Sequence, residues 1–396
     1  MRIAMIGTRG VPARYGGFET AVEEIGARLA ERDHEIIVYC RNPGQRERHH
    51  RGMRLVNLPA IRTRSMETLS HSLLSTAHAV ITARPDMAFV FNPANAPVIP
   101  LLRAAGVPVA VNVDGLESER AKWQGPAARY LRWAEVTAMR SADVVIADSR
   151  VIAEHVRARS GRDAVYIPYG AGPSDEAPER LRELDLEWHG YVLAVARLEP
   201  ENQIDVIIEG YRDVPGDMPL VVVGANPYPG EHVARVRALA AADARVRLLG
   251  SIHDQQMLDT LYAGARLHVH GHAVGGTNPS LLRAARVAPV LAYDTPFARE
   301  VLGYGAQGYW QGTSDFCSQV VSTLRAQRVP ALADIIDSRF SWDCVARDYE
   351  VIARLLVTAS LSLPNRNQQD VADPLASSFP IATVRPVQHK TSKGAA

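Results

Sequence analysis

Glycines and arginines gather in the segment Gly7–Thr20, between a short apolar run and a helix-like pattern. Its glycines stand at positions 7, 10, 16 and 17, which is neither the GxGxxG spacing of a dinucleotide loop nor a phosphate loop ending in Gly-Lys-Ser/Thr. Gly16 and Gly17 place flexible backbone before a helix N-terminus, where unpaired N–H groups and the helix dipole favour an anion. Arg9 and Arg14 add positive charge. The segment predicts an anion-binding loop, with a plain tight turn as the alternative.

A second glycine-containing turn, Gly-Gly-Thr-Asn-Pro-Ser-Leu-Leu, spans Gly275–Leu282. Asn278 suits the N-cap of a helix and Pro279 its first turn, while the two glycines let a ligand approach the backbone. Because open α/β sheets bind ligands at the carboxyl ends of their strands, the turn predicts a nucleotide or phosphate site. The predicted ligand-binding residues of this turn are Gly275, Gly276, Thr277, Asn278 and Ser280.

Three histidines, His268, His270 and His272, come just before this turn. Their spacing of two places them on one face of a strand, which is compatible with a metal site. No carboxylate is near them in the sequence, so we do not predict a metal there.

Arg197 closes another apolar run, in Val-Ala-Arg-Leu-Glu-Pro. At the carboxyl end of a strand, its guanidinium could clamp a diphosphate through paired hydrogen bonds. The alternative is a surface ion pair with Glu199 or Glu201. Only three of the 44 basic residues are lysines, so an anion site in the folded body must use arginine, backbone N–H groups or Lys122.

Asp114 follows a further apolar run, in Asn-Val-Asp-Gly-Leu-Glu. A carboxylate at the end of a buried strand can accept a hydroxyl hydrogen bond or a proton, so Asp114 joins Arg197 as a candidate catalytic residue. The alternative is that Asp114 caps the next helix. Lys122 and Trp123 follow, and they fit an acceptor contact and ordinary packing equally well.

The segment Arg41–Arg64 is strongly basic, with seven arginines against the single acid Glu47. A solvated loop explains this charge. An anionic membrane surface or a phosphate-bearing lipid acceptor explains it equally well.

Length and composition limit the classes of protein to which this chain can belong. The chain has 396 residues, enough for two or three domains, and its formal charge of +1 argues against a nucleic-acid partner. Three scattered cysteines, Cys40, Cys317 and Cys344, exclude a disulfide framework and lack zinc-site spacing. The first residues do not form a secretory apolar region, and no apolar run approaches the roughly 18 residues of a membrane span. We therefore expect a cytoplasmic protein.

Apolar runs alternate with amphipathic stretches in both halves of the chain, which predicts doubly wound α/β sheets. In the first half we expect strands at Ile3–Ile6, Glu35–Tyr39, Arg54–Leu58, Met87–Phe91, Pro108–Val113, Asp143–Ala147 and Ala164–Ile167, and helices at Glu19–Glu31, Thr68–Thr82, Ala127–Arg140 and Val151–Arg159. In the second half we expect strands at Tyr191–Ala196, Leu220–Val223, Val246–Leu249, Leu267–His270 and Pro289–Ala292, and helices at Ile204–Arg212, Glu231–Ala241, Asp254–Ala263, after Pro279, and at Ser314–Arg325.

The break between the two series predicts the domain organisation. We expect a Rossmann-like domain at residues 1–170, a linker at 171–190, a second Rossmann-like domain at 191–341, an amphipathic helix at 342–358 and a disordered tail at 359–396. The two domains would face each other across a cleft.

Several motifs along residues 1–357 resemble the retaining GT-B glycosyltransferases of family 4, and in particular a bacterial rhamnosyltransferase-like branch that builds surface polysaccharides. They are IGTRGVPARYGGFETAVEE, ETLSHSLLS, FNPANAPVIPLLR, VNVDGLE, ADSRVIAEH, IPYGA, VARLEPEN, GHAVGGTNPSLL and FSWDCVARDYE.

The resemblance implies an acceptor domain, then a donor domain that holds a nucleotide sugar, and a final helix that crosses back to the first domain. Gly16 and Gly17 match the glycine loop near the donor phosphate, Arg197 matches the diphosphate clamp, and Asp114 falls where the family has a polar residue near the reacting sugar. No metal or other cofactor is implied.

The chain departs from the family pattern at four positions. Asn202 replaces the usual lysine partner of the clamp, and the family's two glutamates fall at Gly275 and Arg283. A guanidinium has no hydrogen-bond acceptor, so Arg283 cannot bind ribose hydroxyls as a glutamate would, although it could pair with a donor phosphate. Arg286 stands nearby where small residues are expected.

The predicted function is transfer of a sugar, with rhamnose suggested by the branch, from a nucleoside-diphosphate sugar to a polysaccharide or lipid-linked glycan. Retention of configuration, no metal, and a cytoplasmic place with peripheral contact at the inner membrane face belong to this prediction. The main alternative, motivated by Asn202 and Arg283, is an inactive relative that acts as a partner in a polysaccharide assembly complex. A nucleotide-sugar epimerase would share the double Rossmann plan but has no support in the motifs.

Overall fold

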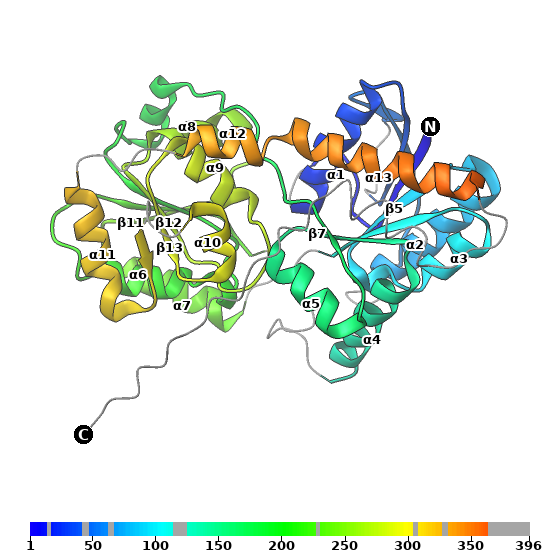
Figure 1. The fold of residues 1–396 in the computed structure, drawn as a ribbon. Coiled ribbons are helices and arrows are strands. Elements are labelled where there is room, and N and C mark those ends of the chain that lie inside the picture. The colour runs from blue at the N-terminus through cyan, green and yellow to red at the C-terminus, as the bar shows by residue number, and fades with distance from the viewer. Residues whose placement is uncertain are drawn as a thin grey trace, which may run out of the picture.

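A computed structural model describes residues 1–13, 17–41, 47–61, 67–113, 125–226, 230–303, 308–326 and 332–362. Two sheets, each with helices on both faces, lie side by side, and a long helix near the end of the chain begins between them and runs along the first sheet's side (Figure 1). This arrangement confirms the predicted α/β architecture.

The first sheet has the strand order β3-β4-β2-β1-β5-β6-β7-β8. Its strands are β1 (Arg2–Ile6), β2 (Glu35–Cys40), β3 (His49–His50), β4 (Met53–Asn57), β5 (Met87–Phe91), β6 (Val109–Val113), β7 (Val144–Ala147) and β8 (Val165–Tyr166). Only the β3–β4 pairing is antiparallel among the described strands of this sheet. Side chains of β1, β5 and β6 are buried along nearly their whole length, as both faces of a parallel sheet require.

Helices cover both faces of this sheet. They are α1 (Gly17–Ala30), α2 (Glu67–His78) with a π-helical turn η1 (Ala79–Ala83), the short turn η2 (Pro93–Asn95), α3 (Val98–Ala104), α4 (Gly125–Ser141) and α5 (Arg150–Ser160). Local chemistry sets the ends of α5: the Ser149 side chain accepts from the Ile152 N–H at 3.2 Å, and Gly161 ends the helix at a left-handed φ of 74°.

The second sheet has the order β11-β10-β9-β12-β13-β14 and its described pairings are parallel. Its strands are β9 (Val192–Val195), β10 (Leu220–Val223), β11 (Val246–Gly250), β12 (Leu267–His270), β13 (Val290–Tyr293) and β14 (Gly308–Trp310). Its helices are α6 (Ile204–Tyr211), α7 (Glu231–Ala241), α8 (Gln255–Gly264), α9 (Pro279–Val287), α10 (Pro296–Leu302), α11 (Thr313–Arg325) and α12 (Ala333–Arg339), with the short turns η4 (Pro178–Leu184) and η5 (Pro200–Asn202).

The last described helix, α13 (Trp342–Ser362), connects the two sheets physically. It begins beside Gly170, where a Cβ would come within 2.5 Å of the Trp342 ring, and it then packs along α1 (Figure 1). The Tyr349 hydroxyl accepts a 2.5 Å hydrogen bond from Asn112 at the first sheet. One hydrophobic cluster therefore extends from the first sheet through α13 into the second sheet.

The structure differs from the sequence prediction in a few local elements. The helix expected at 68–82 is α-helical only to His78, because the chain widens into η1 and closes through a 2.7 Å bond from the Arg84 N–H to the Ala79 carbonyl. The short elements β3, α3, α10, β14 and α12 were not predicted, since few residues leave little periodicity to detect. The stretch predicted as a linker packs on α8 and buries Leu181 and Leu186.

Candidate functional site

The candidate site lies where loops after strands of the two sheets meet. Gly7 follows β1 and Asp148 follows β7 in the first sheet, whereas Arg197 follows β9 in the second. All of these strands are parallel to their neighbours, so the loops emerge at the carboxyl edges. Gly16 and Asp114 lie outside the described residues, as do Arg14, Lys122 and Trp123. The prediction of a tail at 359–396 is wrong for its first residues, because α13 continues to Ser362, and its remainder lies outside the described residues.

The N-termini of α1 and α9 face each other across this junction. A Cβ added to Gly17 would lie 3.7 Å from Cγ of Pro279, in ordinary contact. Gly17 is the first residue of α1 and Pro279 the first of α9. The positive ends of two helix dipoles therefore lie next to each other, which favours an anion nearby.

The turn before α9 is capped as its sequence predicts. The Asn278 side-chain oxygen accepts from the Ser280 N–H at 2.9 Å and the Leu281 N–H at 3.4 Å. The Ser280 hydroxyl donates to the Val195 carbonyl at 3.2 Å, which ties the helix start to the end of β9. These bonds fix the start of α9 beside the strand that leads to Arg197.

The same turn joins the two lobes of the molecule, the first built on the sheet of β1–β8 and the second on the sheet of β9–β14. The Thr277 hydroxyl donates a short hydrogen bond to the Asp148 carbonyl of the first lobe, and both residues are buried. Gly276 lies so close to Asp148 that an added Cβ would be 2.0 Å from a carboxylate oxygen. Glycine is therefore required at position 276 by the close contact of the lobes. Gly275 has φ of +150°, which also favours glycine.

Arg197 is exposed at the end of β9, and its guanidinium forms no ion pair with any acid in the described parts of the chain, Glu199 and Glu201 included. Its backbone is fixed, however. The Arg197 carbonyl accepts from the Asn202 side chain at 2.9 Å and from the Glu199 N–H at 2.8 Å. Asn202 is 3% exposed, so this residue orders the Arg197 loop from inside and adds no cation to the site.

Arg283 is neutralised inside the second lobe. Its guanidinium forms a short ion pair with the Asp259 carboxylate and lies 5.2 Å from the Tyr262 ring centroid. Its side chain is 27% exposed and that of Asp259 10%. The charge at this position is therefore balanced by α8. Arg286 is likewise paired, with Asp337 on α12 at 2.7 Å.

A polar network in the first lobe, which we did not predict, holds the loop after β1. The Asn95 amide donates to the carbonyls of Phe91 at 2.8 Å and Gly7 at 3.4 Å, and the Ser72 hydroxyl donates to the Asn95 oxygen at 2.6 Å. Asn95 and Ser72 are fully buried. The FNPANAP and SHSLL segments thus meet behind Gly7. The polar residues within these two segments are the only signal in the sequence for this contact.

Two of the three histidines, His268 and His270, lie in β12, and His272 lies just beyond its end. His268 and His270 are 0% and 3% exposed, and the His270 and His272 rings stack at 4.4 Å. Burial lowers the pKa of His270 to about 3 and also lowers the pKa of His268 far below its ordinary value. Both imidazoles are therefore neutral at pH 7. No group of three metal-ligating side chains occurs among the described residues.

A second contact between the lobes joins α5 to α10. The Glu300 carboxylate accepts from the Arg150 N–H at 3.0 and 3.2 Å, and the Arg150 guanidinium lies 5.1 Å from the Tyr166 ring centroid. Burial raises the pKa of Glu300. An acid thus meets the N-terminus of α5, where a helix favours negative charge.

Two described hollows lie away from this junction. One of about 700 Å³ lies at the edge strands β3 and β4, and one of about 400 Å³ lies beside Trp188. None of the helices that the structure describes is long and apolar enough to cross a bilayer.

The architecture is the GT-B fold of glycosyltransferases. Sucrose-phosphate synthase from Thermosynechococcus elongatus superposes with a TM-score of 0.78 at 18% identity, covering 90% of this chain and 99% of that one. HepE from Anabaena in complex with UDP-glucose gives 0.72 at 17% identity, covering 89% and 100%. The catalytic domain of starch synthase IV from Arabidopsis thaliana, bound to ADP and acarbose, gives 0.70 at 13% identity, covering 90% and 99%.

Sequence comparison agrees for the first lobe. Residues 16–170 match the family described as Glycosyl transferase 4-like domain. O-antigen chain mannosyltransferase B from Escherichia coli is 27% identical over 143 residues, which is 35% of this chain and 36% of that protein. The match thus spans about a third of the length of that curated relative.

Proposed function

We propose that this protein is a glycosyltransferase that takes a sugar from a nucleoside-diphosphate sugar and passes it to a polysaccharide or lipid-linked glycan. The observation that carries the proposal is the meeting of two helix N-termini, at Gly17 and Pro279, beside the exposed Arg197 that has no ion pair among described acids. The GT-B fold and the match of residues 16–170 support the same class.

The arrangement suits stabilisation of a leaving diphosphate. As the bond between the anomeric carbon and the donor oxygen breaks, negative charge grows on the diphosphate. Arg197 and the N–H groups at the starts of α1 and α9 would oppose this charge. The acceptor hydroxyl oxygen bonds to the anomeric carbon on the same face, and its proton passes to the departing diphosphate oxygen. This retaining route needs no strong protein base, metal or other cofactor.

The remaining site residues have supporting roles in this proposal. Gly16, Gly17, Gly275 and Gly276 would let the backbone approach the donor, while Thr277, Asn278 and Ser280 hold the start of α9 in place. Asp114 would contact the reacting sugar. The resemblance of several motifs to the rhamnosyltransferase-like branch suggests rhamnose as the sugar, and UDP-glucose in HepE makes uridine diphosphate the first nucleotide to test.

The basic segment between Arg41 and Arg64 bears on where in the cell the enzyme works. We propose that the enzyme works in the cytoplasm, in peripheral contact with the inner face of the membrane that carries its acceptor.

A second candidate is an inactive relative that serves as a partner in polysaccharide assembly. The loss of the family glutamate at Arg283 and of the lysine at Asn202 favours it. Donor binding distinguishes the two functions, because an inactive partner has no need to hold a nucleotide sugar.

The test is a thermal-shift screen of the full chain against a panel of nucleotide sugars, followed by transfer assays with the donor that stabilises it. Replacing Arg197 with alanine should lower transfer by roughly a hundredfold or more, since one lost donor to a developing anion has that effect. Arg235→Ala is the matched control, because Arg235 lies on α7 with a 56% exposed side chain. A wild-type chain that no nucleotide sugar stabilises would favour the inactive partner.

A further inference from the structure

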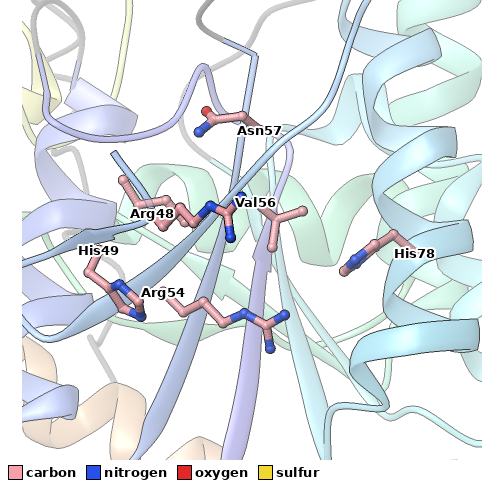
Figure 2. A pocket seen from close by; sticks show the side chains of 7 residues that line it. Arg48, His49, Arg54, Val56, Asn57 and His78 are labelled. Carbon is pink, nitrogen blue, oxygen red and sulfur yellow. The ribbon is translucent and has the colours of Figure 1, made fainter. Parts of the chain in front are cut away.

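The hollow at the edge of the first sheet is lined mainly by polar and basic side chains. It has a volume of about 700 Å³ and is bounded by Arg48, His49, Arg54, Leu55, Val56, Asn57 and His78. Figure 2 shows the side chains of Arg48, Arg54 and His78 on three sides of Val56. The first two come from the β3–β4 hairpin and the third from the end of α2. The lining contains no acidic residue.

Basic side chains on the two sides of this hairpin differ in whether an acid neutralises them. Toward α1, His50 bonds Glu23 at 2.7 Å and Arg51 bonds Glu24 at 2.6 Å. In the hollow, the nearest acid in an ion pair is Glu35, 3.9 Å from the Arg54 guanidinium and at the limit of such an interaction. Arg48 and His49 make no ion pair with the acids that the structure describes. The hollow therefore concentrates positive charge that the protein does not neutralise.

His78 is held in place as a hydrogen-bond donor. Tyr39 is fully buried, and its hydroxyl lies 3.0 Å from Nδ1 of His78. Burial raises the pKa of Tyr39, so the hydroxyl keeps its proton and can donate it to Nδ1. Burial and the nearby Arg54 charge lower the pKa of His78, which keeps the imidazole neutral with its own proton on Nε2. An N–H donor thus joins the two guanidinium groups.

Exposed apolar side chains lie about one helical turn before and after His78 in the same helical segment. Leu74, one turn before His78 on α2, is 45% exposed, and Ile81 in η1 is 71% exposed. Basic groups next to exposed aliphatic side chains fit a molecule that has an anionic group beside an apolar part.

We propose that this hollow is a phosphate-binding site, separate from the junction of the lobes, in which Arg48, Arg54 and His78 hold the anion. Arginine suits this role because its planar guanidinium pairs with two phosphate oxygens at once. The phosphate belongs either to the headgroup of an anionic lipid, with Leu74 and Ile81 against the bilayer, or to a soluble phosphate compound. The site does not depend on the proposed transferase function.

The first measurement is calorimetric titration of the full chain with inorganic phosphate, in the Arg197→Ala background so that the junction contributes little. Arg54→Gln should weaken phosphate binding about fivefold or more, the effect expected for one lost positive group near an anionic ligand. Arg51→Gln is the matched control, because it removes the same charge from the other side of the same hairpin and should leave binding nearly unchanged. Thermal unfolding of each variant monitors folding.

The second measurement is sedimentation of the same variants with vesicles of phosphatidylglycerol and phosphatidylcholine, against phosphatidylcholine alone. Loss of phosphatidylglycerol binding in Arg54→Gln and in Leu74→Ser identifies a lipid headgroup. Phosphate binding that depends on Arg54 without any preference for phosphatidylglycerol identifies a soluble ligand. If Arg54→Gln and Arg51→Gln have the same phosphate affinity and the same vesicle binding, the proposed site is wrong. These results hold whether or not the protein transfers a sugar.

Discussion

At the scale of single residues, Arg283 shows how the fold accommodates an arginine where the glycosyltransferases that the sequence resembles have a glutamate. Its guanidinium is paired with Asp259 and lies against Tyr262, so the position has become part of the α8–α9 packing. A glutamate at position 283 alone would place two carboxylates together with little water.

We therefore expect Arg283→Glu to lower the free energy of unfolding by roughly 2–4 kcal/mol, because a largely buried pair loses one partner and gains a like charge. The exchange Asp259→Arg with Arg283→Glu should recover much of this loss. Urea unfolding of the two variants and the wild type measures it. If Arg283→Glu is as stable as the wild type, the pair is not structural. Donor binding by the stable exchange variant then reports whether a glutamate at position 283 helps.

At the scale of elements, the start of α9 carries both a structural and a proposed binding role. Asn278 caps the helix, and Ser280 ties it to β9. Loss of an N-cap side chain typically destabilises a protein by about 1 kcal/mol.

Asn278→Ala should therefore lower the free energy of unfolding by about 1 kcal/mol and also weaken nucleotide-sugar binding severalfold. Thr295→Ala is the control, because Thr295 caps α10 through a 3.1 Å bond from the Ala298 N–H. It should have a similar effect on stability without the effect on binding. Calorimetry with the donor found by thermal shift makes the comparison, and equal donor affinities in both variants would contradict a ligand at α9.

At the scale of the whole molecule, two polar contacts hold the lobes against each other. One joins Gly276 and Thr277 to Asp148, and the other joins Glu300 to the start of α5. Long helix α13 adds a continuous apolar connection on another side (Figure 1).

Gly276→Ala should separate the loops, since its Cβ would meet the Asp148 carboxylate at 2.0 Å. We expect a larger radius of gyration in small-angle scattering and loss of donor binding, with little change in secondary structure. The control Gly312→Ala has open space around the new methyl group and should behave as the wild type. An unchanged scattering profile for Gly276→Ala would show that the loops adjust locally.

Buried neutral histidines make the whole fold sensitive to acid. Burial lowers the pKa of His71 to about 4 and of His270 to about 3, below the ordinary value of 6.5. The unfolded chain takes up these protons first, so stability is complete above about pH 6.5 and falls as the pH drops toward 4. Each histidine should contribute roughly 1 kcal/mol per pH unit in that range. Urea unfolding between pH 7 and pH 5 measures the slope, which should be shallower in His71→Leu.

The sequence by itself determined the alternation of strands and helices, because residues buried on both faces of a parallel strand must be apolar along its length. It also located the helix start at Asn278, whose cap is a local interaction, and it marked Arg197 as the residue at the end of β9. Short elements such as α3 and β14 escaped prediction, since their helical or extended state depends on what packs over them.

Tertiary structure alone decided which of these segments meet. The residues around Gly276 do not predict its contact with the Asp148 carboxylate. Likewise, the residues around Arg283 do not predict its ion pair with Asp259, since each pair joins segments that are distant in the sequence. Asn202 reads as a missing cation in the sequence, yet in the folded protein it is a buried hydrogen-bond donor to the Arg197 carbonyl. Whether a charge is paired, buried or exposed follows from contacts across the fold, and these contacts set the chemistry of the site.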